Sequence, residues 1–328
     1  IRARARIFLD TYRNKWGKIM FNWSTLQYKM KYSFNKVVPA LYQAGFESKA
    51  KKISECGHFK ELAICKNCGE TYLNGFNTCK DRFCPVCEKK RSYLWLAKLA
   101  PIVKEYLNEK KIINMLTLTI VDEPNLKDAL SILSKTWRVM VHDNKLLAKN
   151  FKTRFIGGFR ALEVKRGKYC GLWHAHYHCL VVKDKYSKDF EWIKSSWQKA
   201  YRIVTGNNVS LEVRIDDIKK NYKQDIGIIL EVAKYVTKFD WSFNDDVKEL
   251  VESLIGVRTT STWGCLRKKL TEQNIENDMD KTLNEVVDLV CKSCGNNTFD
   301  ILEGLTGNNY MVSDYMDNEL SKGDIEND

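Results

Sequence analysis

The sequence predicts an α+β fold in which helices pack against a largely antiparallel β-sheet. Between residues 112 and 240, stretches rich in β-branched residues alternate with stretches of helical periodicity, in the order β-α-β-β-α-β-α. Only GKYCG (167–171) separates the two central strands, which indicates a hairpin and therefore antiparallel pairing. Closely spaced cysteines precede this region and predict an N-terminal zinc-binding module.

Each element is expected from its own pattern. IINMLTLTIV (112–121) is typical of a buried strand, and residues 126–142 carry apolar side chains at helical spacing. The expected strands are 112–121, 155–166, 172–183 and 209–215, and the expected helices are 92–111, 126–142, 189–203, 224–239 and 245–255. The predicted parts are a basic helical N-terminal segment (1–55), a cysteine-rich module with its connecting helix (56–111), the main α+β domain (112–270) and an acidic C-terminal tail containing CxxC (271–328), which we expect to be partly mobile.

Charge is distributed unevenly along the chain. Residues 1–270 carry 51 Lys and Arg against 27 Asp and Glu, whereas residues 271–328 carry 3 against 14. The basic body suits a polyanionic partner, although a merely solvated surface is the alternative. No apolar stretch approaches the roughly 20 residues that span a bilayer. We therefore expect a cytoplasmic protein without a membrane partner; because the sequence begins at Ile1, an earlier N-terminal piece can be missing.

Three of the five histidines share the stretch LWHAHYHCLVV (172–182). Side chains alternate along a strand, so His174, His176 and His178 point to the same face. Imidazoles at alternate positions can chelate one divalent ion, whereas the alternative is a solvent-facing polar strip. The hairpin places Glu163 beside them as a further ligand, or else as an exposed carboxylate or an ion-pair partner of Lys165 or Arg166. Such a site accepts Mg²⁺, Mn²⁺ or Zn²⁺.

EVAKYVTKF (231–239) places Glu231 and Tyr235 on one helical face, flanked by Lys234 and Lys238. A phenol that attacks phosphorus needs help to lose its proton, and nearby lysines lower its pKa. A carboxylate one turn away can activate a water molecule. A core or interface role is the alternative for Tyr235.

Six of the eleven cysteines lie between residues 56 and 87, in spacings typical of zinc sites rather than of disulfides. The simplest grouping is one zinc held by two CxxC pairs, Cys65, Cys68, Cys84 and Cys87, which leaves Cys56, His58 and Cys79 unexplained. A second partition pairs CKNCG (65–69) with CKSCG (291–295), so that Cys56 or His58 joins Cys79, Cys84 and Cys87. The zinc is expected to be structural, and basic side chains beside it are expected to contact DNA phosphates: Arg82, Lys89, Lys90 and Arg91.

The ordered motifs LTLTI (116–120), WHAHYHCLVV (173–182) and EVAKYVTK (231–238) resemble those of the HUH endonucleases, in particular the initiators of rolling-circle plasmids from Gram-positive bacteria. The resemblance covers roughly residues 50–270 and implies an HUH-like antiparallel sheet. It implies that His176 and His178 hold a divalent metal, Mg²⁺ or Mn²⁺. His174 matches an additional histidine of the plasmid group and is expected to be either a third ligand or a contact to the scissile phosphate. It also favours grouping Cys79, Cys84 and Cys87.

The activity implied by this resemblance is nicking of one DNA strand at a plasmid origin. Tyr235 would form a 5′-phosphotyrosine bond, a 3′-OH would prime synthesis, and Glu231 would promote the water attack that ends replication. The implied partners are an origin hairpin that is single-stranded at the nick, a host helicase and polymerase, and a second copy in a homodimer. Lys234 and Lys238 are expected to bind this DNA. The alternatives are a single-strand transposase, a metal-dependent hydrolase without a covalent step, and a zinc-stabilised DNA-binding regulator without catalysis.

Overall fold

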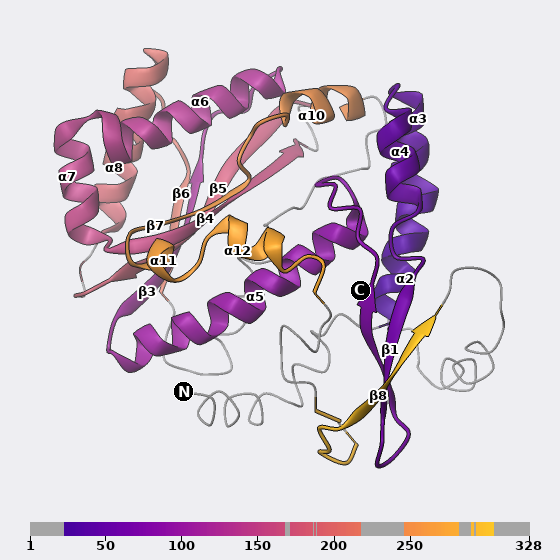
Figure 1. The fold of residues 1–328 in the computed structure, drawn as a ribbon. Coiled ribbons are helices and arrows are strands. Elements are labelled where there is room, and N and C mark those ends of the chain that lie inside the picture. The colour runs from indigo at the N-terminus through magenta and orange to yellow at the C-terminus, as the bar shows by residue number, and fades with distance from the viewer. Residues whose placement is uncertain are drawn as a thin grey trace.

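The computed structural model describes residues 23–167, 171–185, 187, 189–217, 246–281, 290–291 and 293–304. Within them the chain forms helices and two antiparallel sheets (Figure 1), which confirms the α+β class. The predicted helix 224–239 lies outside the described residues. Among the helices that are described, none is both long and apolar enough to cross a bilayer.

In the described part of the chain, the main sheet has five strands in the order β6-β3-β5-β4-β7, and each neighbouring pair is antiparallel. The strands are β3 (Ile112–Thr119), β4 (Gly157–Arg166), β5 (Trp173–Lys183), β6 (Val213–Asp217) and β7 (Thr260–Trp263). The four strands expected from the sequence are confirmed. The fifth strand, β7, was not expected from the sequence, because four residues are too few to show alternation.

Helices cover both faces of this sheet (Figure 1). One face carries α6 (Leu126–Arg138), which continues into the π-helical turn η2 (Val139–Asp143), together with α7 (Lys145–Arg154) and α8 (Phe190–Thr205). The other face carries α5 (Pro85–Asn108). The ring of Trp95 on α5 lies 4.5 Å from that of Phe159 on β4, while Trp137 on α6 lies 5.8 Å from Tyr177 on β5. Large aromatic rings thus fill the core on each side of the sheet.

The helix expected at 92–111 begins earlier than its apolar pattern does. Cys84 is the residue before its first turn, and Pro85 is its first residue. Proline is favoured at this position because an N–H group there would have no partner within the helix, so its absence costs nothing. The N-terminal segment is helical where it is described, as expected: α2 (Trp23–Tyr32), the π-helical turn η1 (Ser33–Val37), α3 (Val38–Gln43) and α4 (Glu47–Ser54).

A second sheet, which was not predicted from the sequence, joins the cysteine-rich module to residues 299–304 in the C-terminal part of the chain. Its order is β2-β1-β8, formed by β1 (Lys60–Cys65), β2 (Thr71–Phe76) and β8 (Phe299–Gly304). Residues 299–304 pair with β1 along its whole length. The acidic tail therefore contributes a strand to the cysteine-rich module, and this pairing between distant segments has no local sequence signal.

The segment of residues 247–281 also packs against the body. It contains α10 (Val247–Ser253), α11 (Gly264–Lys269) and α12 (Glu272–Asn277). Arg91 on α5 donates to Glu276 on α12 at 2.6 Å, and Lys98 on α5 forms an ion pair with Asp278. Acidic residues just after the boundary expected at residue 270 therefore pair with basic residues of α5.

Candidate functional site

Strand register brings three metal-binding side chains together on the face of the main sheet that α5 also contacts. Glu163 pairs with His176, and Ala161 pairs with His178, across β4 and β5. Paired residues of adjacent antiparallel strands project to the same face, so the carboxylate lies beside both imidazoles. All three side chains are buried, with 5%, 3% and 6% of Glu163, His176 and His178 exposed.

The donor atoms of these side chains converge. One carboxylate oxygen of Glu163 lies 2.6 Å from Nε2 of His176 and 3.0 Å from Nε2 of His178, and the two nitrogens lie 2.9 Å apart. An ion held about 2.1 Å from each donor places neighbouring octahedral ligands about 3.0 Å apart. The arrangement therefore fits three ligands on one side of a divalent ion.

Protonation favours metal binding as well. Burial opposes ionisation of Glu163, but hydrogen bonds from His176 and His178 outweigh it and hold the pKa of the carboxyl well below its usual range. Burial lowers the pKa of His176, which keeps the ring neutral, the form that binds metals. The hydroxyl of Thr117 lies 3.3 Å from Nδ1 of His178 and orients that ring.

His174 does not join this cluster, contrary to its expected place as a metal ligand. Its Nδ1 lies 2.6 Å from a carboxylate oxygen of Asp122, just beyond the end of β3, and its ring centroid is 4.9 Å from that of His176. The acidic partner draws the side chain away from the convergence point. Thr117 and Asp122 had no sequence signal beyond their position in, and shortly after, the strand that precedes the histidines.

Four expected site residues lie outside the described part of the chain. These are the nucleophile and its neighbours on the expected helix 224–239, Glu231, Lys234, Tyr235 and Lys238. Their roles remain predictions.

The cysteines form two clusters, each able to hold a metal ion. In the first, which is buried, Cys56, Cys79, Cys84 and Cys87 converge, and Sγ of Cys87 lies 3.5 Å from that of Cys56 and 3.6 Å from that of Cys79. Four thiolates bound tetrahedrally at about 2.3 Å lie about 3.8 Å from one another, so these separations suit zinc. Hydrogen bonds with the thiols of Cys56, Cys79 and Cys84 lower the pKa of Cys87, and the charge of Arg91 lowers it further.

The second cluster joins CKNCG and CKSCG. Sγ of Cys65 lies 3.6 Å from that of Cys294, and Sγ of Cys68 lies 3.4 Å from that of Cys291. The two motifs have the same backbone geometry, because the amide of the glycine donates to the carbonyl of the first cysteine in each, at 2.8 Å and 2.9 Å. The single site expected from Cys65, Cys68, Cys84 and Cys87 is therefore wrong, since β1 and β8 carry the first two cysteines to the C-terminal pair.

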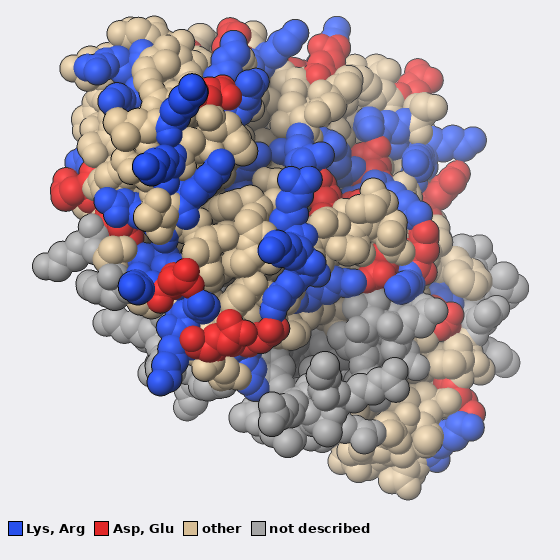
Figure 2. Space-filling model, turned by 60° about the vertical axis from the view of Figure 1, so that its left-hand side comes forward, with Lys and Arg blue, Asp and Glu red and all other residues tan. Residues whose placement is uncertain are grey.

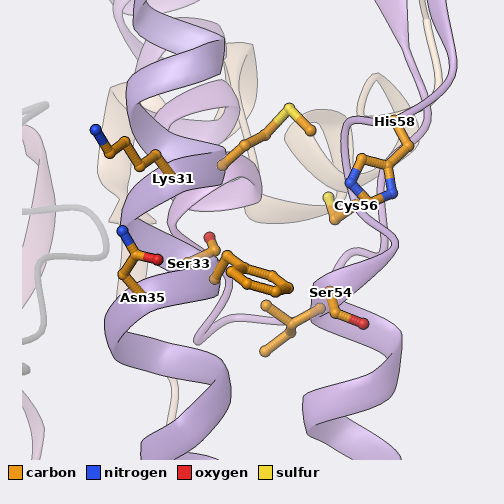
Figure 3. A pocket seen from close by; sticks show the side chains of 9 residues that line it. Lys31, Ser33, Asn35, Ser54, Cys56 and His58 are labelled. Atoms are coloured by element: carbon orange, nitrogen blue, oxygen red, sulfur yellow. The ribbon is translucent and has the colours of Figure 1, made fainter. Parts of the chain in front are cut away.

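A cavity of about 320 Å³ lies between α2–η1 and the end of α4. Figure 3 shows His58 beside Cys56 at this cavity, with Ser33 on the facing helix. His58 is not among the donors that converge in the first cluster. Of the two residues that the second partition offered as the fourth ligand, Cys56 is therefore the one that joins Cys79, Cys84 and Cys87. The cavity is separate from Glu163, His176 and His178, none of which lines it.

The basic residues near the cysteines are less available to DNA than expected. Only 1% of Lys90 and 6% of Arg91 is exposed. Lys90 donates to the carbonyl of Lys281, and Arg91 binds Glu276. Arg82 donates to the carbonyls of Leu254 and Val257, and Lys89 is half-buried. Lys90 and Arg91 are therefore internal cations that hold the segment after residue 270, and their expected contact with phosphates is wrong.

Comparison with known proteins points to replication. A family model described as "Replication protein" matches residues 70–295, which include Glu163, the three histidines and Cys291 and Cys294. A protein named "Protein rep" from Lentilactobacillus hilgardii is 29% identical over 259 residues, covering 73% of this chain and 80% of the relative. Another of that name from Streptococcus pneumoniae is 27% identical over 292 residues, covering 83% and 86%. No solved structure matches.

Proposed function

Because this chain belongs to the replication protein family, we propose that it starts rolling-circle replication of a plasmid by nicking one strand of the origin through a covalent tyrosine intermediate. The observation that carries the proposal is the convergence of Glu163, His176 and His178, which suits a divalent ion, Mg²⁺ or Mn²⁺. Such an ion supplies Lewis-acid polarisation of a phosphate oxygen when bound.

In this proposal the side chains of the cluster hold the divalent ion, and through it they position the scissile phosphate. Glu163 contributes a negative charge, and imidazoles bind metals in their neutral form, so the three ligands would leave a divalent site with net positive charge for a phosphate. Thr117 and Asp122 fix the rings of His178 and His174, which keeps the phosphate-binding face in one geometry.

Tyr235 supplies the nucleophile. Its oxygen forms a bond to phosphorus, the bond from phosphorus to the 3′ oxygen breaks, and that oxygen takes up a proton to become the 3′-OH primer. Lys234 and Lys238 favour the phenolate. Glu231 accepts a proton from water in the later step that releases the displaced strand.

Replacing Tyr235 tests this proposal. Tyr235→Phe keeps the ring but removes the attacking oxygen, so it should abolish the covalent adduct that the protein forms with a labelled single-stranded origin hairpin and Mn²⁺. The adduct is detected as a labelled band that survives denaturing electrophoresis. Tyr201→Phe, on α8, is the matched control and should leave it unchanged. An undiminished adduct in Tyr235→Phe would exclude Tyr235 as the nucleophile.

A further inference from the structure

The cavity between α2–η1 and the end of α4 combines an apolar lining with a buried hydroxyl group. Met30, Phe34 and Ile53 supply the apolar surface. Only 3% of Ser33 is exposed, yet its hydroxyl forms no hydrogen bond with a described residue. Figure 3 shows Ser33 on the side of its helix that faces Cys56 across the cavity. Because a buried hydroxyl without a partner is destabilising, an occupant that can form a hydrogen bond there is favoured.

An exposed aromatic ring belongs to the same lining. Phe34 is 67% exposed, although it lines the cavity together with Ile53, which is almost completely buried. Large apolar side chains that are exposed beside a cavity are typical of surfaces that bind another polypeptide segment, because a rigid ring gives extensive apolar contact. The cavity therefore suits a peptide segment that carries apolar side chains.

Lysine side chains surround this cavity. Residues 23–58 carry six Lys and no Arg against two Glu. Lys31 lines the cavity. Lys36 on η1, and Lys51 and Lys52 in the last turn of α4, are exposed within two residues of a lining residue. None of these four lysines forms an ion pair with a described residue. Their summed charge favours an acidic occupant.

Strand β8 runs toward this cavity. It is antiparallel to β1, and its last residue, Gly304, pairs with Lys60, the first residue of β1. His58 lines the cavity and lies two residues before Lys60, which corresponds to about 7 Å at about 3.3 Å per residue. The chain therefore leaves β8 within a few residues of the cavity.

The residues that follow β8 have the composition that this cavity favours. Residues 305–328 carry six Asp and Glu against one Lys. In MVSDYMDNEL (311–320) the acidic residues alternate with apolar ones, and an aspartate stands on each side of Tyr315 and Met316. Residues 1–22 carry six Lys and Arg against one Asp, so repulsion by the lysines disfavours them as the occupant.

Charge alone does not distinguish this cavity from the rest of the surface. Lys and Arg side chains also gather on the α7 side of the molecule (Figure 2), where Lys145, Lys149 and Lys152 are exposed on one helix. Helix α7 packs against the main sheet, whereas β8 belongs to the second sheet. The apolar lining, the hydroxyl of Ser33 and the end of β8 set the cavity apart from this second basic surface.

We propose that the cavity between α2–η1 and α4 binds residues 311–320 of the same chain. In the docked segment, Tyr315 and Met316 contact the apolar lining, the phenol forms a hydrogen bond with the hydroxyl of Ser33, and the flanking aspartates face the four lysines. The eleven residues from Gly304 to Tyr315 can span about 36 Å, so the connection is long enough. Docking joins the acidic segment to the cysteine-rich module and is independent of the proposed nicking reaction.

Carbodiimide cross-linking tests the docking. This reagent joins a lysine to a carboxylate without a spacer, so it reports ion-pair contact, and the joined peptides of the zinc-loaded full chain are identified by mass spectrometry. We expect cross-links from residues 314–319 to the four lysines beside the cavity. Their absence would overturn the proposal. Cross-links in equal yield to the three exposed lysines of α7 would overturn it as well, since they would show that any basic surface attracts the segment.

Replacing the apolar side chains of the segment separates apolar contact from charge. Tyr315→Ser combined with Met316→Ser keeps every charge and every described residue, and it should lower the yield of these cross-links about tenfold, because two buried apolar side chains are lost. Ile325→Ser, in the same acidic segment, is the matched control and should change the yield by less than about twofold. An undiminished yield in the double variant would contradict docking in the cavity.

A variant of the cavity gives the converse test. Phe34→Ala removes a ring that is mostly exposed and should also lower the cross-link yield, while the zinc content stays at the parental value. Tyr42→Ala, on α3, is the control, because Tyr42 is 48% exposed and does not line the cavity. Equal yields in the two variants would overturn the proposal.

Isotope labelling identifies the source of the segment. Labelled and unlabelled chains are mixed before cross-linking, and docking within one chain gives joined peptides that are either both labelled or both unlabelled. Mixed pairs in the proportion expected for random association would show that a second copy supplies the segment, and they would overturn docking within the same chain.

Discussion

Glu163 illustrates how a residue's neighbour across a hairpin determines its chemistry. Its own neighbours in sequence, Lys165 and Arg166, offered an ordinary ion pair. In the structure Arg166 instead binds Asp246, and Glu163 accepts from His176 and His178. The carboxylate is buried and ionised only because two donors face it, which is the environment of a metal ligand rather than of a surface charge.

The two neighbouring histidines should differ in their effect on metal affinity. His178→Asn removes a converging donor and should weaken Mn²⁺ binding at least tenfold, a magnitude typical even of changes in the groups that orient ligands. His174→Asn is the matched control on the same strand face, and because its ring faces Asp122, Mn²⁺ affinity should change by less than threefold. Free Mn²⁺ is measured by electron paramagnetic resonance during titration of zinc-loaded protein. An equal loss of Mn²⁺ affinity in both variants would indicate that His174 is also a metal ligand.

At the scale of elements, the contact between β4 and the start of α11 requires glycine. Gly264 has φ +55°, and a Cβ there would lie 2.1 Å from the carbonyl oxygen of Ile156. Neither the backbone angle nor the contact tolerates a side chain, since the atom met is backbone rather than a flexible end. This close approach lets the basic helix α11 begin directly at the edge of the sheet.

Alanine substitutions test this element contact. Gly264→Ala should lower the free energy of unfolding by more than about 3 kcal/mol, because left-handed strain of about 1–3 kcal/mol adds to the clash. Gly256→Ala is the control, since φ is +72° but nothing lies within 4 Å of the added Cβ, so only the strain remains. Urea unfolding of both variants gives the comparison. A cost for Gly264→Ala no larger than that for Gly256→Ala would show that the backbone shifts freely at this contact.

At the scale of the whole molecule, the second cysteine cluster closes the chain on itself. Cys65 and Cys294 are 229 residues apart and Cys68 and Cys291 are 223 apart, yet each pair is in contact. A bound zinc would link the C-terminal segment to the N-terminal module. The pairing of β1 with β8 and the ion pairs between α5 and the segment around α12 provide further links.

Zinc content tests this closure. The purified protein should contain two zinc ions per chain by mass spectrometry, and combined Cys291→Ser and Cys294→Ser should lower the count to one, since two thiolates do not hold zinc against dilution. Cys265→Ala is the control, because Cys265 belongs to neither cluster, and should leave the count at two. A count that stays at two in the C-terminal double variant would show that Cys291 and Cys294 do not hold the second zinc, and a count of one in the unchanged protein would favour the single site of Cys65, Cys68, Cys84 and Cys87.

Much of the fold and of the candidate site followed from local pattern. Alternation along 172–183 placed the histidines on one face, the GKYCG turn paired that strand with the one carrying Glu163, and cysteine spacing indicated zinc. The small sheet, β7 and the burial of Lys90 and Arg91 did not follow. Each of these features depends on pairing with a segment far away in the chain. Such pairing leaves no hydrophobic periodicity in the short stretch of sequence that takes part in it.

The sequence by itself determined which chemical groups the protein presents and on which side of each element they lie, because backbone geometry repeats every two residues in a strand and every 3.6 in a helix. Only the tertiary structure decided which of those groups meet. Asp122 draws His174 away from the ion site, β8 carries Cys291 and Cys294 to Cys65 and Cys68, and the acidic segment after residue 270 internalises Arg91. Convergence of donors depends on strand register and on contacts between distant segments, and no local period encodes either.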